Sequence, residues 1–300
     1  MPSRLRCRTR SSTPAPVTIH PVKREDGLLG PDSVAWRVIG HPVSIVGGLR
    51  SLIVQALHPL AMAGVAQHSD YRRRPLDRLR RTSHYVAATT FGDRATAEAA
   101  AARVRAIHKR VRGIDPVTGQ PYSADDPDTQ LWVHCVEWHS FLAAYRAYAT
   151  SRLSPGEEDR YIAEGAPIAA LLGVPEETVP RTVEEMRSYF AGVRPQLCVS
   201  DSTRDAIAFV MNPPLTRELI PLQVPLRITA AAAVAIMPRD LRELARIGQP
   251  RVVDGLLRAA VPPAAAALRL PLLRDAPRLV LGPESHKLGR QARRRLAEAA

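Results

Sequence analysis

The chain has 300 residues, of which 45% are hydrophobic and only 5% aromatic, and it carries a formal net charge of +13. That length is enough for one large domain with its own core, and the scarcity of aromatic residues favours helices over strands. The charge lies mainly at the ends, where residues 1–26 hold six Arg and Lys against two acids and residues 283–300 hold five against two. No helix-turn-helix, RNP or zinc-finger spacing accompanies the charge, so we exclude nucleic acid as a partner.

The N-terminal residues and the spacing of the cysteines bear on the cellular compartment of the protein. Residues 1–27 are basic and lack the apolar segment of a secretory signal, so we predict a disordered basic N-terminal tail. Their Arg- and Ser-rich composition is also that of a transit peptide, which leaves import into an organelle open. Cys7, Cys135 and Cys198 are far apart and form no CxxC pair. A reducing compartment, the cytoplasm, fits this cysteine usage best.

In chain order, the first apolar run covers residues 44–64 and contains Arg50 and Pro59. These residues break the run, so we expect no membrane span, and a soluble or peripheral protein. Next, Pro75 is typical of a first helical turn and Gly92 of a helix end, which predicts a helix over residues 75–91.

Asp93 caps a second predicted helix, which ends before Gly113 because glycine suits the left-handed position after a helix. A turn-rich link follows, and Asp126-Pro127 begins a long helix. Two capping boxes start two more helices: Ser154 with Glu157, and Thr182 with Glu185. Beyond residue 212, Ala- and Leu-rich helices alternate with proline pairs. We therefore predict an all-α fold with a single helical domain over residues 28–282 and a basic C-terminal tail over residues 283–300.

One histidine, His108, lies in the arginine-rich end of the helix predicted after Asp93. It belongs to an apolar face whose members recur every three or four residues, so it points inward. This face holds Ala97, Ala101, Val104, His108 and Val111. The alanines leave room beside the imidazole for a large flat group such as haem, and Arg105 and Arg112 flank the face where a guanidinium can pair with a haem propionate. Burial and these positive neighbours should lower the pKa of His108 and leave a ring nitrogen free for iron.

Less specific interpretations stay open at this point. An inward histidine whose N–H bonds to a backbone carbonyl is commoner than a haem ligand, and alanine faces also serve close helix packing. A zinc or di-iron site is not indicated, because the chain has no HExxH motif and His134 and His139 are five residues apart, on different helix faces. Without a GxSxG, P-loop or suitably placed GxGxxG motif, nothing indicates a serine hydrolase, an NTPase or a Rossmann enzyme.

Several segments together resemble the family of rubber oxygenase and MpaB oxygenase. They are "HPLAMAGVAQHSDYRRRPLDRLRRTSHYVAATTFGD", "RAIHKRVRG" and "YSADDPDTQLWVHCVEWHSFLAAY", in that order and at similar spacing. The similarity continues more weakly to about residue 190. It implies an all-α b-type haem protein with a globin-like core, which uses dioxygen on a small apolar substrate such as an isoprenoid or a lipid.

The resemblance also implies roles for individual residues. In rubber oxygenase the proximal histidine has arginines three residues before and four after it, and His108, Arg105 and Arg112 match this pattern. The distal helix there carries an arginine, a lysine three residues on, and then a threonine. The matching residues here are Arg78, Arg81 and Thr82. Arg78 and Thr82, one helical turn apart, would donate hydrogen bonds to dioxygen as it attacks an alkene.

Two departures from the family pattern limit these implications. Arg81 replaces the lysine, and a guanidinium stays protonated, so it can contact the haem but cannot ligate iron. The distal glutamate of rubber oxygenase has no acidic counterpart, because Met62, Gln67 and His68 occupy that region. Cleavage of a carbon chain is therefore not implied.

Other functions and other residues remain candidates. The chain could bind haem as a sensor, a carrier or a peroxidase-like protein, or it could be a structural helical protein without a cofactor. His58 and His134 are secondary pocket candidates. His68 and His84 are alternative distal residues, although His68 falls in a predicted turn and His84 faces away from Thr82 on their helix.

Overall fold

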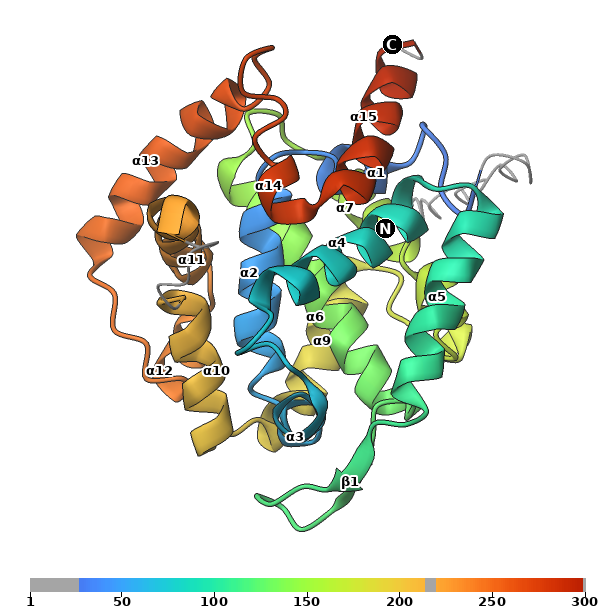
Figure 1. Cartoon of the computed structure of the whole chain (residues 1–300), viewed down its shortest axis with the longest axis vertical. Coiled ribbons are helices and arrows are strands. Elements are labelled where there is room, and N and C mark those ends of the chain that lie inside the picture. Colours follow the sequence, from blue (N-terminus) through green and yellow to red (C-terminus); the bar gives the residue numbers. More distant parts are fainter. Residues whose placement is uncertain (1–26, 214–219, 299–300) are drawn as a thin grey trace, which may run out of the picture.

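A computed structural model describes residues 27–213 and 220–298 of the chain (Figure 1). Helices form nearly all of its regular structure, which confirms the all-α prediction, and one two-stranded hairpin is the exception in these ranges. The predicted disordered tail over residues 1–27 lies outside the described residues apart from Gly27. The elements are α1 (Val34–Ile39), α2 (Ser44–Gln55), α3 (Pro59–His68), α4 (Pro75–Phe91), α5 (Arg94–His108), β1 (Arg112–Ile114), β2 (Pro121–Ser123), α6 (Pro127–Tyr148), α7 (Pro155–Ala163), α8 (Ala166–Leu171), η1 (Glu176–Thr178), α9 (Val183–Val193), η2 (Arg194–Gln196), α10 (Asp201–Met211), η3 (Ile220–Leu222), α11 (Gln223–Ala235), α12 (Arg239–Leu244), α13 (Arg251–Ala267), α14 (Arg278–Leu281) and α15 (Pro283–Glu298).

Helices α2 and α6 pack along each other in the middle of the molecule (Figure 1). Helix α11 packs between α2 and α13. On another side of the molecule, α4 packs against α5 and α15. The α2–α6 contact is close because α2 has a glycine where it meets the backbone of α6. A Cβ atom on Gly47 would lie only 2.9 Å from the Phe141 Cα and the Ser140 carbonyl oxygen. This glycine sets the distance between the two central helices.

Replacing Gly47 by alanine is expected to lower the free energy of unfolding by about 2 kcal/mol, because the added methyl group would meet backbone atoms that cannot turn aside. The neighbouring Gly48 is the matched control, since a Cβ there would lie 4.0 Å from the nearest atom, Phe141 Cε1. Gly48→Ala should be neutral or stabilising by up to about 1 kcal/mol, through helix propensity. Urea unfolding followed by circular dichroism measures both variants, and equal stabilities would contradict this account of the contact.

Side-chain caps begin the helices where the sequence predicts them. Asp93 accepts a hydrogen bond from Thr96 N and starts α5, and Asp126 starts α6 in the same way. The Ser154–Glu157 capping box is complete. The second predicted box is only half formed, because Glu185 accepts from Arg181 N rather than from the backbone of the N-cap Thr182.

The end of α5 corrects the sequence prediction. The helix ends at His108 rather than before Gly113, and the following residues pair as the hairpin β1–β2 instead of a turn-rich link. Gly113 has no positive φ. It is needed for packing, because a Cβ there would lie 2.9 Å from the hydroxyl of Tyr122 on the opposite strand. That hydroxyl also donates to Gln67 at 2.8 Å, so the hairpin ties the end of α5 to α3.

Two further features concern the ends of the described chain. Helix α1 has only six residues, and its first two N–H groups donate to the carboxylate of Glu164, at 3.1 Å from Val34 N and 2.8 Å from Ala35 N.

At the C-terminal end, the residues predicted from the sequence as a basic tail form α15, which packs on α4. Its small residues Gly289 and Ala292 are buried, so the arginines of this segment lie on a folded helix.

No single described helix is long and apolar enough to cross a membrane. Helices α2 and α3 would pass that test of length and composition only as a pair, and they are bent by 102° at the break between them.

Candidate functional site

His108 ends α5 and is half-buried, in line with the inward face predicted for it. Burial is the main cause that lowers the pKa of His108, while the Asp125 charge and the neighbouring Gln130 side chain act in the opposite direction. The prediction that Arg105 and Arg112 contribute to this shift is not supported, since neither is among its causes. The ring is therefore neutral at pH 7, and its buried Nδ1 has no hydrogen-bond partner among the described residues.

Gln130, on α6, supplies a second buried atom without a partner. Its amide nitrogen donates to the carbonyl oxygen of Leu172 at 2.9 Å, which fixes the side chain. Its Oε1 is buried and accepts no hydrogen bond from the described residues. Hydrogen bonding to Gln130 acts to raise the pKa of His108, so Gln130 Oε1 and the imidazole lie close enough to interact with each other. Sequence reasoning missed Gln130.

The two arginines that flank His108 differ in their surroundings. Arg105 is half-buried, and its Nε has no partner among the described residues. Its guanidinium lies against Gly173, where a Cβ atom would sit 3.5 Å from Arg105 Nη2. Arg112 is exposed in β1 and donates to the carbonyl oxygen of Lys109. Only Arg105 therefore faces the interior beside His108.

The structure separates the three candidates on α4. Arg78 is half-buried and donates to Ser69 Oγ at 2.6 Å, with its guanidinium 5.7 Å from the centre of the Tyr71 ring. Burial lowers the pKa of Arg78. Arg81 and Thr82 are exposed. Of this group, only Arg78 is directed into the protein.

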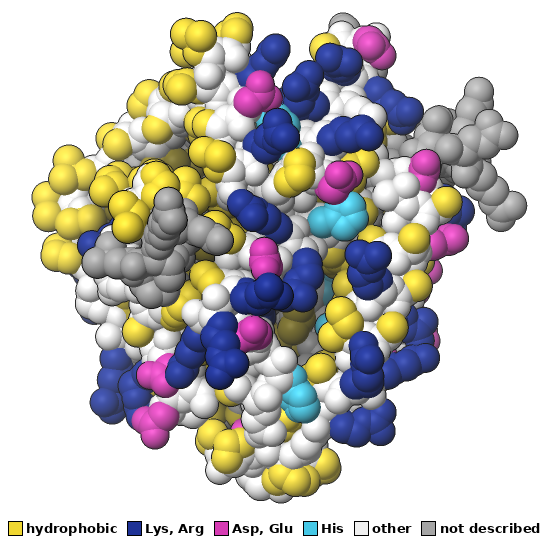
Figure 2. Space-filling model, in the orientation of Figure 1, with side chains coloured by type: hydrophobic (Ala, Val, Ile, Leu, Met, Phe, Trp, Pro, Cys, Tyr) yellow, Lys and Arg dark blue, Asp and Glu magenta, His cyan; other side chains and the backbone are white. Residues whose placement is uncertain are grey.

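A buried carboxyl group, that of Glu137, lies on α6, and the sequence analysis did not predict it. Burial raises the pKa of Glu137 to about 7, although part of the side chain keeps accessible surface. The charge of Glu137 also contributes to raising the pKa of Tyr85 on α4, so these two groups lie near each other. The molecular surface is hollowed between α4 and α5 (Figure 2). A carboxyl group surrounded by protein that still keeps accessible surface is suited to accept and release a proton.

Of the remaining histidine candidates, His134 and His68 have structural partners, whereas His58 and His84 each have a buried Nδ1 without a partner among the described residues. His134 is buried and stacked on Trp138, with ring centres 5.4 Å apart, and burial lowers its pKa to about 4. His58 is buried beside Trp132. His68 Nε2 lies 3.1 Å from the hydroxyl of Tyr122. His84 is half-buried on α4, and its Nδ1 has no partner among the described residues.

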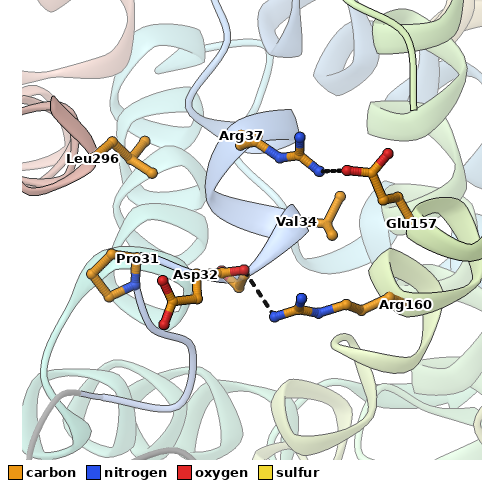
Figure 3. Close-up of a pocket in the computed structure, with 8 residues that line it drawn as sticks. Pro31, Asp32, Val34, Arg37, Glu157, Arg160 and Leu296 are labelled. Carbon is orange, nitrogen blue, oxygen red and sulfur yellow. Dashed lines mark hydrogen bonds and ion pairs between the residues drawn. The ribbon is translucent and has the colours of Figure 1, made fainter. Parts of the chain in front are cut away.

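A cavity of about 510 Å³ is a surface cleft beside α1 and α7 (Figure 3). Arg37 of α1 points to Glu157 of α7 there, and Arg160 donates to the Asp32 carbonyl oxygen at 2.8 Å. None of the residues predicted for the site lines this cleft. A second cavity, of about 330 Å³, is lined by Ser69 and Tyr71, the two contacts of Arg78.

A family model for the catalytic domain of ER-bound oxygenase mpaB/B' and rubber oxygenase matches residues 36–270. The chain belongs to the MpaB/rubber oxygenase family. This is a family of oxygenase type, and the matched region runs from α1 into the segment after α13. No curated protein matches the chain.

A solved member of this family has a similar fold. The "Structure of Latex Clearing Protein LCP in the closed state" aligns with a TM-score of 0.56 and 17% sequence identity, covering 88% of this chain and 73% of the other. At that identity the similarity supports the fold alone. In this structure His108 and Arg105 lie at the end of α5, with Gln130 of α6 beside His108, while Arg78 lies on α4 and Glu137 further along α6.

Proposed function

We propose that this protein is a b-type haem-dependent oxygenase that uses dioxygen on a small apolar substrate, of which isoprenoids and lipids are examples. His108 is the proposed iron ligand. One observation carries the proposal: a neutral, half-buried imidazole with an unpaired nitrogen lies beside an amide oxygen that is also unpaired. Membership in an oxygenase family supports the same reading.

The residues present fit a haem better than a free metal ion. Among the described residues, no three His, Cys, Asp or Glu side chains gather closely enough to hold a metal. A haem iron is held mainly by its porphyrin, so a single protein side chain, here His108, would be enough to hold the group. With one ring nitrogen of His108 on iron, the other can donate to Gln130 Oε1, and such a bond orients a ligating histidine. Gln130 is thus a positioning residue.

Other residues have separate proposed roles around this ligand. Haem, when bound, supplies the redox chemistry that activates dioxygen. Arg105 would pair with a haem propionate. Arg78 would donate a hydrogen bond toward dioxygen, and Glu137 would hold or accept a proton during oxidation of the substrate. Thr82, a catalytic candidate from the resemblance, would have to turn inward to take part.

Arg105→Ala is expected to weaken haem binding about 10- to 150-fold, which corresponds to one charge-assisted contact of about 1.5–3 kcal/mol. Arg112 was predicted from the sequence to act similarly, but it is exposed and bonded to the Lys109 carbonyl oxygen. Arg112→Ala is therefore the matched control and should change the affinity little. The rate of haem transfer to apomyoglobin measures both variants, and equal rates for wild type and Arg105→Ala would count against propionate pairing.

The arginine at position 81 leads to a prediction for the distal side of the haem. Because a guanidinium cannot supply a lone pair, Arg81 would leave a bound haem accessible to added ligands, and cyanide or imidazole should bind readily. Electron paramagnetic resonance of the resting ferric protein should then show a high-spin or water-ligated haem. A low-spin signal that disappears in a His68 or His84 variant would show that one of these histidines is the distal ligand.

The function is tested by expressing the full chain in haem-replete cells. A Soret band, followed by oxygen uptake in the presence of an isoprenoid alkene, is the expected result. A Soret band without oxygen uptake on any alkene or lipid would favour a sensor, a carrier or a peroxidase-like protein. A folded protein without haem would favour a structural role.

We also propose a cytoplasmic location. Cys135 and Cys198 are both free thiols, which is usual in a reducing compartment.

A further inference from the structure

Large hydrophobic side chains are exposed together on α11, α13 and the segment that follows α13. Figure 2 shows them gathered over α11 and α13 and continuing to the top of the molecule. We call these residues the outer apolar face. They are Val224, Ile228, Val252, Leu256, Leu270, Leu272 and Leu273. Leu272 is 96% exposed, which is rare for a leucine without a partner.

The outward side of α13 has no charge along its length. Val252, Leu256, Ala259, Pro263 and Ala266 follow one another at helical spacing and are all exposed. The inward side packs on α11, and Ala265 is buried there. A surface helix normally carries polar residues outward, so the apolar outward side of α13 is unusual for a surface in contact with water.

The charges that border this face are basic. Arg251, Arg269, Arg274 and Arg278 are exposed, and none of them forms an ion pair with another described residue. The acidic residues near this face bind other side chains. Asp254 pairs with Arg242 at 2.7 Å, and Asp275 lies 2.7 Å from His286 Nε2.

We propose that the outer apolar face docks on the surface of a lipid bilayer that contains anionic lipids. Leucines beyond the end of α13 enter the region between headgroups and acyl chains, and the bordering arginines meet the headgroup phosphates. A second copy of the chain is a poorer occupant, because two such faces would bring like-charged arginines together without acids to neutralise them. The docking does not require haem, so its test is independent of the proposed oxygenase activity.

Co-sedimentation with vesicles tests this proposal. The full chain should sediment with vesicles that contain phosphatidylglycerol, much less with phosphatidylcholine alone, and less at high salt. The double variant Leu272→Asp/Leu273→Asp should lower the bound fraction about tenfold or more. The matched control is Ile114→Asp/Val117→Asp on the hairpin, where the side chains are 59% and 50% exposed, and it should bind like wild type. Circular dichroism checks that each variant is folded.

Three results would overturn the proposal. The first is no binding to either kind of vesicle. The second is unchanged binding in Leu272→Asp/Leu273→Asp, which would assign vesicle binding to another basic part of the chain. The third is a dimer in light scattering that Leu272→Asp/Leu273→Asp dissolves, which would make a second copy the occupant.

Discussion

Replacing His108 by alanine is expected to abolish stoichiometric haem binding while most of the helical circular-dichroism signal survives. The imidazole is the proposed iron ligand, and its unpartnered Nδ1 lies near Gln130, whose Oε1 is also unpaired. His108 is half-buried at the end of α5, so its loss should not remove the core. The Soret absorbance per protein, after purification from haem-replete cells, measures the effect.

His68→Ala is the control for this experiment, because His68 is exposed and its ring lies against the hairpin tyrosine Tyr122. That variant should keep its haem. If His108→Ala retained a full complement of haem, the proposed ligand would be wrong. If both variants lost haem equally, the loss would reflect a damaged fold near the hairpin rather than a missing ligand.

Glu137→Gln is expected to make the protein about 3 kcal/mol more stable than wild type at pH 8, with little difference at pH 4. The folded-state pKa of Glu137 is raised by burial from 4.5 to about 7. A raised pKa means that the folded protein binds the extra proton, so this contribution to stability is complete below about pH 4.5 and is lost as the pH rises through about 7. Glutamine stays neutral and has no such loss.

Urea unfolding of wild type and variant across this pH range measures the difference between them. Buried histidines such as His134 and His139, whose pKa values burial lowers to about 4 and about 3, act in the opposite direction. They are present in both proteins, so their effect cancels in the comparison. Glu98→Gln is the control, since Glu98 is exposed and pairs only with Arg94. Parallel stability curves for wild type and Glu137→Gln would mean that the carboxyl group is solvated.

The starts of α5, α6 and α7 could be predicted from the sequence, because each is fixed by a local hydrogen bond. The side chains of Asp93, Asp126 and Ser154 accept hydrogen bonds from backbone N–H groups three residues ahead. Each cap therefore depends on only a few consecutive residues. The inward side of α5 could be predicted too, because Ala97 and Ala101 mark it by their spacing. The hairpin could not, since three-residue strands have no periodicity and Gly113 is equally suited to a helix end.

The part of the site on α6 could not be predicted from the sequence. This helix is buried on almost every side, so no contrast between polar and apolar faces shows which way Gln130 or Glu137 points. The raised pKa of Glu137 comes from the helices packed around it, which are distant in sequence. Likewise, spacing alone gave Arg105 and Arg112 equal roles, whereas the end of α5 at His108 turns Arg112 to the solvent.

The capping of α1 by Glu164 sets an order of events during protein synthesis. A six-residue helix does not form alone in water, and the carboxylate that binds its first N–H groups is 130 residues further along the chain. At ribosomal rates the wait for Glu164 is on the order of ten seconds. Val34 and Ala35, buried in the finished protein, lack the acceptor of their backbone N–H groups in the nascent chain throughout that interval. Chaperones that recognise apolar segments thus have their longest opportunity to bind at the N-terminal end of this fold.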